Sequence, residues 1–207
     1  MERATLKNNA KASLKGKYGD AILLTILYLA INYVAGLLFN FIAIKINIEQ
    51  ELLYSGRNIT MYVISCITVF GYESYYLKIS RKEQTDFKEL FSKTKLFGIA
   101  LIITFLVDFL KTIGLLLFIV PGIIISLVYS QVYFIKLDNP ELGITEVLKK
   151  SRLLMKGHKM DYFVLQLSFL GWIILGVFTF GILYLWLIPY MSLTAANFYN
   201  ELIKTSK

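Results

Sequence analysis

The sequence of 207 residues has almost none of the side chains on which enzymes and metal sites most often depend. It contains one histidine, His158, and one cysteine, Cys66, so a His-containing metal cluster, a Cys-His nucleophile pair and a dithiol motif are excluded. A glycine-rich phosphate-binding loop of the Walker type is absent as well. We therefore expect a protein that is not an enzyme and that has no catalytic residue, metal ion or cofactor.

Charge is scarce too. Asp, Glu, Lys and Arg make up 17% of the chain, against roughly 25% in an ordinary soluble domain, whereas 57% of the residues are hydrophobic and 15% aromatic. With three prolines and one cysteine, the chain is neither a proline-rich disordered segment nor a disulfide scaffold. This balance excludes a soluble globular domain and predicts an integral membrane protein.

Long runs without charge are what the sequence does contain, and a helix needs about 20 mostly apolar residues to cross a membrane. Such runs, two of them interrupted by one or two charged residues, lie at residues 21–44, 58–79, 96–111, 114–135 and 162–200. The last run is about twice as long as one crossing requires, so we expect a turn at residues 179–181 that separates 162–178 from 182–199. The sequence therefore predicts six membrane-spanning helices.

The 22 Lys and Arg residues are distributed unevenly over the expected loops. Nineteen fall in the N-terminal segment, in the second-to-third and fourth-to-fifth connections and at the C-terminus, which leaves Lys45, Arg57 and Lys111 on the other side. The positive-inside rule places the nineteen in the cytoplasm. Both termini are then cytoplasmic, as an even number of spans requires.

Each basic segment also has the periodicity of a helix, weakest at residues 80–95. Such helices lie in the headgroup plane, with their apolar face toward the membrane and their cations toward anionic lipid. The residues that we expect to bind anionic phospholipid or a protein partner are Arg3, Lys7, Lys11, Lys15, Lys149, Arg152, Lys156 and Lys159. Gly16 and Gly157 are expected to end two of these helices, and Asp20 and Asp161 to begin the next ones.

The expected fold is all-α, a polytopic helical bundle of three transmembrane hairpins, each preceded by a cytoplasmic amphipathic helix. The chain forms one integral membrane domain, 1–207. Its parts are an interfacial helix at 1–20, a hairpin at 21–79, an interfacial segment at 80–95, a hairpin at 96–136, an interfacial helix at 137–160, a hairpin at 161–200 and a tail at 201–207.

Ionisable residues inside a span are candidates for function, because their burial in the membrane is costly. Glu73 is the clearest case, but its tyrosine neighbours favour a position where its carboxylate either reaches the headgroups or pairs with a nearby lysine. Asp108 and Lys111 are three residues apart, so we expect them to form an ion pair on one helix face.

Two prolines also lie inside the predicted spans. Each removes a backbone donor, so we expect kinks at Pro121 in the fourth span and at Pro189 in the sixth. The carbonyls freed at such kinks are usually satisfied by neighbouring helices. We expect the turn between the third and fourth spans at Gly114, which interrupts the apolar run.

Several further residue runs form a recognisable pattern. They are Lys15-Gly16, Val120-Pro121-Gly122, Asp138-Asn139-Pro140, Ser151 to Lys159, Ser168 to Trp172, Trp186 to Tyr190 and Ala196 to Tyr199. Over nearly the whole chain, and most specifically from Pro121 onward, the sequence resembles the domain of unknown function 975 family. The resemblance implies a small multi-pass protein of the bacterial cytoplasmic membrane, and it transfers no catalytic residue.

Two functions remain open. In the first, a non-enzymatic membrane protein engages anionic lipid, or a protein partner that can be a second copy of the chain, through its basic cytoplasmic face and serves envelope homeostasis. Nucleic acid is not an expected partner. In the second, the chain is a transporter or export component for a small or apolar substrate, because proline-broken spans recur in a repeated architecture. Glu73 is the residue that a transport function would use.

Overall fold

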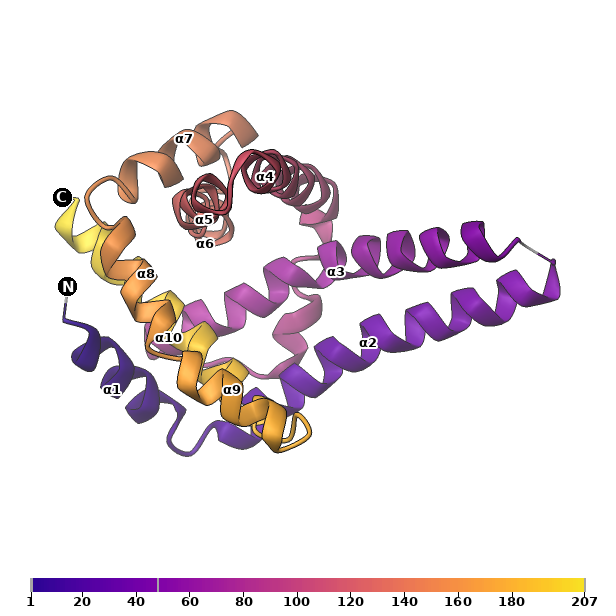
Figure 1. Cartoon of the computed structure of the whole chain (residues 1–207). Helices are drawn as coiled ribbons and strands as arrows, with labels where there is room; N and C mark the ends of the chain where they lie inside the picture. The colour runs from indigo at the N-terminus through magenta and orange to yellow at the C-terminus, as the bar shows by residue number, and fades with distance from the viewer. Residues whose placement is uncertain (1, 48, 207) are drawn as a thin grey trace.

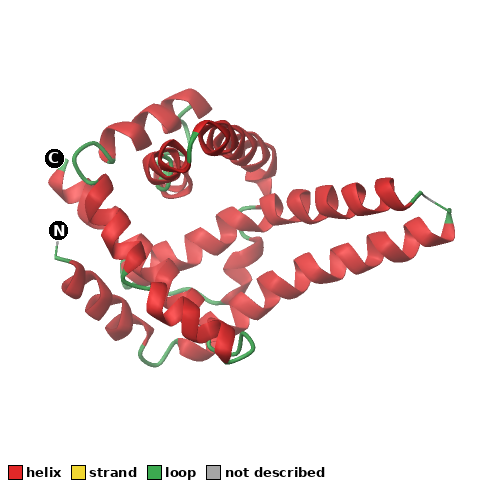
Figure 2. Ribbon diagram, viewed as in Figure 1, coloured by secondary structure: helices red, strands yellow, loops and turns green. Residues whose placement is uncertain are grey.

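The computed structural model describes residues 2–47 and 49–206, and all regular structure in that part of the chain is helical, as expected (Figure 2). In chain order the elements are α1 (Arg3–Leu14), α2 (Tyr18–Lys45), α3 (Gln50–Ser80), the 3-10 helices η1 (Phe87–Phe91) and η2 (Thr94–Leu96), α4 (Phe97–Leu117), α5 (Ile119–Val128), α6 (Val132–Asp138), α7 (Ile144–Leu154), α8 (Lys159–Leu167), α9 (Leu170–Phe178) and α10 (Tyr184–Thr205).

The long helices pair in chain order, and the pairs point away from one another. In Figure 1, α2 and α3 lie across the view, whereas α4 and α5 are seen along their axes and α9 runs beside α10 in a third direction. The pairs meet in a region that we call the hub. It consists of the C-terminal half of α3, all of α6 and the C-terminal half of α10, with α1, η1 and α7 packed against them.

The hub contains most of the buried side chains. Tyr75 and Tyr76 of α3 are fully buried with their ring centroids 5.2 Å apart. Phe134 of α6 stacks on Tyr199 of α10 at 5.3 Å. Aromatic side chains bury a large area each, so the contact between Phe134 and Tyr199 helps to hold the second helix pair against the third. Toward the far ends of the pairs, apolar side chains such as Phe41 are largely exposed.

Four segments are long and apolar enough to cross a membrane: Tyr18–Lys45, Phe87–Leu117, Ile119–Asp138 and Lys159–Phe178. In the second segment the apolar part is α4, because η1, η2 and the residues between them include Lys88, Glu89, Lys93 and Lys95. Most of the apolar residues in these segments face outward and have no protein to cover them. The four segments indicate a membrane-embedded protein.

Neither α3 nor α10 is among the four, so length and composition identify fewer spans than the expected six. Both helices are long enough but carry more polar side chains, several of which are paired inside the protein. For example, the hydroxyls of Tyr72 and Ser192 lie 3.3 Å apart, and Asn197 donates to the carbonyl of Leu6. A helix that its neighbours shield from lipid needs less apolar surface of its own.

The turn between the third and fourth expected spans lies at Phe118, where the backbone is extended, and not at Gly114. Gly114 is buried, and a side chain there would lie 2.9 Å from the Cα atom of Gly122, so glycine lets α4 and α5 pack closely. Pro121 is therefore the third residue of α5 and not an interior residue. A missing N–H needs no intrahelical acceptor in the first turn, so the kink expected there does not form. Pro189 does lie inside α10.

The joints after α1 and α7 form as the sequence predicts. Gly16 and Gly157 follow the two helices with φ of 82° and 87°, in the left-handed region that glycine adopts without strain. Asp20 and Asp161 lie in the first turns of α2 and α8. The same backbone conformation at both joints supports an internal repeat.

The fifth expected span is not one helix. Helix α8 ends at Leu167 and α9 begins at Leu170, so the helix is interrupted at Ser168 and Phe169. The turn expected at 179–181 is present, with positive φ at Phe180 and Gly181. Helix α9 has nine residues, which corresponds to about 14 Å.

Candidate functional site

The apolar faces of α1 and α7 are covered by the protein itself. Leu6, Ala10 and Leu14 of α1 are buried, mainly against α10, and Val147 and Met155 at α7 are fully buried as well. The expectation that these faces lie against the membrane is therefore wrong, because the hub occupies them. Only the charged faces remain free to meet lipid headgroups.

Two lysines of α1 instead point toward the third helix pair. The Nζ atom of Lys7 donates to the carbonyl and the hydroxyl of Ser168, at 3.3 and 3.0 Å, and lies 4.2 Å from the ring centroid of Phe169. The Nζ atom of Lys11 lies 5.5 Å from the ring centroid of Tyr190. Partial burial, and then the charge of Lys11, lower the pKa of Lys7 from its usual value. The break between α8 and α9 thus supplies polar partners for a lysine of α1.

These lysines form one wall of a groove between α1, α9 and α10, which we call the lysine-tryptophan groove. Its volume is about 210 Å³, and it is lined by Lys7, Lys11, Tyr18, Trp172, Leu183, Trp186, Leu187 and Tyr190. It contains both tryptophans of the chain. One wall is cationic and the other is aromatic and aliphatic, so the groove suits a ligand with an anionic head and an apolar tail.

The eight cations expected at the interface form two groups and not one patch. Arg3, Lys11 and Lys15 are exposed on α1 or directly after it, and Lys7 is half-buried. On the α7 side, Lys149, Arg152 and Lys156 are exposed and Lys159 is half-buried. In Figure 1, α1 and α7 lie on either side of α8 and α10. The structure therefore brings only the α1 group to the lysine-tryptophan groove.

The α7 group borders a second hollow. This cavity of about 320 Å³ is lined by Lys150, Leu153, Leu154, Lys156, His158, Leu202, Thr205 and Ser206. His158 lies 3.1 Å from Asp161, its partner one turn away. The cavity has cations at its rim but no aromatic wall, so it resembles the first groove in charge only.

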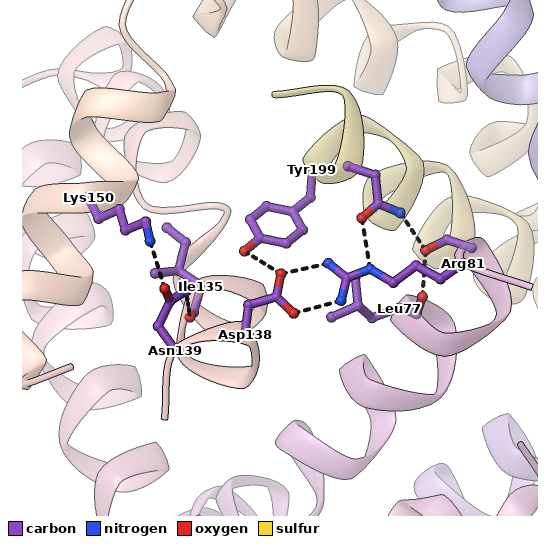
Figure 3. A network of polar contacts seen from close by, with 9 residues as sticks. Leu77, Arg81, Ile135, Asp138, Asn139, Lys150 and Tyr199 are labelled. Atoms are coloured by element: carbon purple, nitrogen blue, oxygen red, sulfur yellow. Dashed lines mark hydrogen bonds and ion pairs between the residues drawn. The ribbon is translucent and has the colours of Figure 1, made fainter. Parts of the chain in front are cut away.

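A polar network that the sequence did not indicate joins the ends of the three helix pairs (Figure 3). Arg81, directly after α3, donates to both carboxylate oxygens of Asp138 at the end of α6, at 2.7 and 2.6 Å. Tyr199 of α10 donates to the same carboxylate at 3.1 Å, and Asn200 accepts from Nε of Arg81 at 3.2 Å. The hydrogen bonds to Asp138 raise the pKa of Arg81. We call this arrangement the Arg81 clamp.

The clamp lies beside the largest cavity described, about 620 Å³ between α1, the end of α3 and α10. Polar side chains predominate in its lining, which consists of Leu6, Asn9, Ala12, Ser13, Ser80, Arg81, Lys82, Asn197, Asn200, Glu201, Ile203 and Lys204. Three cations and one carboxylate face it, without an aromatic or aliphatic wall for an apolar tail. The cavity therefore suits water and small polar solutes better than lipid.

Residues 110–206 match a family model described as protein of unknown function (DUF975). This part of the chain is similar to the DUF975 family. The resemblance seen in the sequence is thereby confirmed, although the match begins in α4 and leaves out α1 to α3. Comparisons with curated proteins and with solved structures find no match. The DUF975 region contains Asp138, Tyr199, Trp172 and Trp186, but their partners Arg81, Lys7 and Lys11 lie outside it.

A second buried cluster precedes the DUF975 region. Glu89 of η1 is buried and accepts hydrogen bonds from Ser74 at 2.6 Å, Lys78 at 2.7 Å and Ser92 at 2.8 Å. Burial acts to raise the pKa of Glu89, but the three donors outweigh it and lower the pKa overall. Next to it, Gly71 of α3 allows the backbone of η1 to approach, because a side chain there would overlap the carbonyl of Leu90.

The ionisable residues expected inside the spans differ in their surroundings. Asp108 and Lys111 form the expected ion pair, with 3.2 Å between Oδ1 and Nζ, and Tyr62 donates to Asp108 at 3.4 Å. Glu73 is half-buried and has no hydrogen bond or ion pair within the described chain. The lysine pair expected for Glu73 is therefore absent, because Lys78 pairs with Glu89 instead.

Proposed function

We propose that this chain is a non-enzymatic, multi-pass membrane protein that binds anionic phospholipid at its basic side, with the lysine-tryptophan groove as a headgroup site. The observation that carries the proposal is the position of the amines of Lys7 and Lys11 at a groove whose opposite wall contains Trp172 and Trp186. A phosphate would meet the amines, and an acyl chain would lie along the indole rings.

The distribution of charge supports this proposal. The formal net charge is +8, and Lys45, Arg57 and Lys111 are the described cations that lie toward the far ends of the helix pairs. The other described Lys and Arg residues lie near the chain ends or between the helix pairs. Each cation near an anionic leaflet contributes about 1 kcal/mol of attraction. Exposed cations on α1 and α7 would therefore hold anionic lipid around the hub even outside the groove.

The proposed arrangement places both termini on the cytoplasmic side of a bacterial cytoplasmic membrane, with the hub at the cytoplasmic ends of the spans. Helices α2 and α3 cross together, and α4 crosses with α5 and α6. At 31 residues α3 is about 46 Å long, which exceeds the hydrocarbon thickness of about 30 Å and accommodates a tilt.

The two tryptophans make the groove directly measurable, because the chain has no others. The protein is placed in phosphatidylcholine nanodiscs that contain a small, equal mole fraction of either brominated phosphatidylglycerol or brominated phosphatidylcholine. Bromine quenches indole fluorescence on contact. We expect stronger quenching by the anionic lipid, since the lysines concentrate it in the groove.

Substitution identifies the residues responsible. Lys11→Gln, alone and together with Lys7→Gln, should remove the preference for phosphatidylglycerol. The matched control is Lys149→Gln with Arg152→Gln, which removes two exposed cations of α7 outside the groove and should leave the preference intact. Equal quenching by the two brominated lipids in the unaltered protein would contradict the proposal.

A further inference from the structure

We infer that the third helix pair inserts its tip, from about residue 170 to 190, into only the cytoplasmic leaflet of the bilayer, instead of crossing it as the sequence predicts. The inference rests on the membrane arrangement proposed above. It identifies this tip as an apolar wedge whose partner is the hydrocarbon of one leaflet.

The first argument concerns the depth of two cations. Lys7 contacts Ser168, and Lys11 lies over the ring of Tyr190. If residues 162–178 and 182–199 crossed the bilayer, Ser168 and Tyr190 would lie well inside it and would bring two lysines into the hydrocarbon. That is a costly place for a cation, so we place Ser168 and Tyr190 at the headgroup level.

The groove gives a second measure of depth. Tyr18, Trp172 and Trp186 line the same small cavity, so they lie at a similar level. Tyrosine and tryptophan favour the membrane-water interface. Tyr18 is followed by Asp20, and the charge-free run of α2 starts only at Ala21. Tyr18 therefore marks the cytoplasmic interface, and both tryptophans share that position.

Too little chain lies beyond this level to reach the other side. From Trp172 to the end of α9 at Phe178 the helix advances about 9 Å, whereas the hydrocarbon is about 30 Å thick. The segment Lys159–Phe178 has the length of a span when α8 and α9 are taken together, but the contacts with α1 place its middle, at Ser168 and Trp172, at the headgroup level.

The chemistry of the tip also fits hydrocarbon better than water. Its exposed apolar side chains include Val177, Phe178, Phe180 and Ile182, and Phe180 is 97% exposed. Charge is absent from residues 162–199 of the sequence, whereas the turn between α2 and α3 lies between Lys45 and Glu49. A tip that ended in the water outside the membrane would be expected to carry charged side chains, as the turn between α2 and α3 does.

The hydroxyls of Thr179 and Tyr184 are paired within the tip. Thr179 donates its hydroxyl to the carbonyl of Gly176 at 3.0 Å and accepts from the N–H of Leu183 at 3.2 Å. Tyr184 donates to the carbonyl of Ile173 at 2.9 Å. In hydrocarbon no water can satisfy such groups, so internal pairing is what an inserted tip requires.

The charge distribution is compatible with the wedge. Removing the fifth and sixth crossings together leaves an even number of spans and keeps all basic segments on the same side of the membrane. The positive-inside rule therefore gives the same orientation for four spans and for six. This is why the sequence alone does not distinguish the two.

Cysteine labelling tests the inference. In a Cys66→Ser background, Phe180→Cys is treated with a membrane-impermeant maleimide in right-side-out and in inverted vesicles. We expect no labelling from either side and full labelling after solubilisation in detergent. Because Phe180 is not covered by protein, only lipid can protect a cysteine at this position. Asn47→Cys, in the turn after α2, should react only from outside, and Gln84→Cys, in the exposed loop after α3, only from inside.

The outcomes separate the two proposals. Labelling of Phe180→Cys from outside, with both controls as expected, would overturn the wedge and restore six spans while leaving lipid binding untouched. If Asn47→Cys does not react from outside, the membrane arrangement itself is wrong and the wedge fails with it. A second readout is tryptophan depth: lipids spin-labelled near the headgroup should quench more strongly than lipids labelled near the chain end, and the reverse order would contradict the inference.

Discussion

Arg81 and Asp138 form a two-bond ion pair, with N to O distances of 2.7 and 2.6 Å, between the end of the first helix pair and the end of the second. Tyr199 brings α10 to the same carboxylate. The helix pairs diverge from the hub (Figure 1), so contacts at their common end have a large share in fixing their relative positions. The clamp is therefore expected to matter for the assembly of the three pairs more than for any single helix.

The geometry of this pair predicts that a positive charge alone at position 81 does not keep the protein as stable as arginine does. Arg81→Lys keeps the positive charge but cannot form two parallel hydrogen bonds with a carboxylate, so we expect a loss of about 1 to 3 kcal/mol of stability. Thermal unfolding of the protein in nanodiscs, followed by tryptophan fluorescence, measures the loss. Lys82→Ala is the control, since the side chain of this exposed neighbour has no hydrogen bond or ion pair within the described chain. Equal melting temperatures for all three proteins would show that the clamp is dispensable.

Close packing of η1 on α3 predicts that two glycine-to-alanine substitutions, at Gly71 and at Gly98, have different effects on stability. In Gly71→Ala the new methyl group would overlap the carbonyl of Leu90, and the shift needed to relieve it should cost about 1 to 3 kcal/mol. At Gly98, in the first turn of α4, nothing lies within 4 Å, so Gly98→Ala should be neutral or stabilise by up to about 1 kcal/mol. The same unfolding measurement compares them, and a neutral Gly71→Ala would mean that η1 is free to move away.

Much of the fold follows from local pattern. Runs without charge and a four-residue repeat of lysines predict where helices form, and a glycine after a basic helix predicts the joints at Gly16 and Gly157. These features depend on residues close together in the chain. Gly114 shows what local pattern does not predict. A glycine in the sequence is compatible with a turn or with a close contact between helices, and only the packing of Gly114 against Gly122 in the structure shows that it makes a contact.

The sites were less predictable, because their residues are far apart in the sequence. Arg81 and Asp138 are 57 positions apart, and Lys7 is 161 positions from Ser168. Arg81 counted only as one of nineteen charges in the loops. The periodicity of α1 predicts an apolar and a basic face correctly, but it does not say whether the apolar face meets lipid or the rest of the protein.

The left-handed backbone conformation at the glycine after α7 predicts that a substitution there lowers stability even though no steric overlap results. A Cβ atom at Gly157 would meet no atom within 4 Å, yet φ there is 87°. We therefore expect Gly157→Ala to destabilise by about 1 to 2 kcal/mol through backbone strain alone, and Gly157→Asn to cost less because asparagine tolerates this region better. Gly171→Ala, in the first turn of α9 and equally free of contacts, should not destabilise. Identical unfolding temperatures for the two alanine variants would contradict this explanation.

The lowered pKa of Glu89 predicts a dependence of stability on pH. Its folded pKa lies below the unfolded value of about 4.3, so the ionised carboxylate stabilises the protein above that pH, and this contribution is lost as the pH falls through the folded pKa. Glu89→Gln should therefore lower stability at pH 7 and flatten its decline in acid. Unfolding temperatures measured from pH 7 downward give both quantities. Glu83→Gln, at an exposed loop position, is the control and should retain the acid-sensitive decline. A Glu89→Gln variant with the same decline as the unaltered protein would show that other carboxylates cause it.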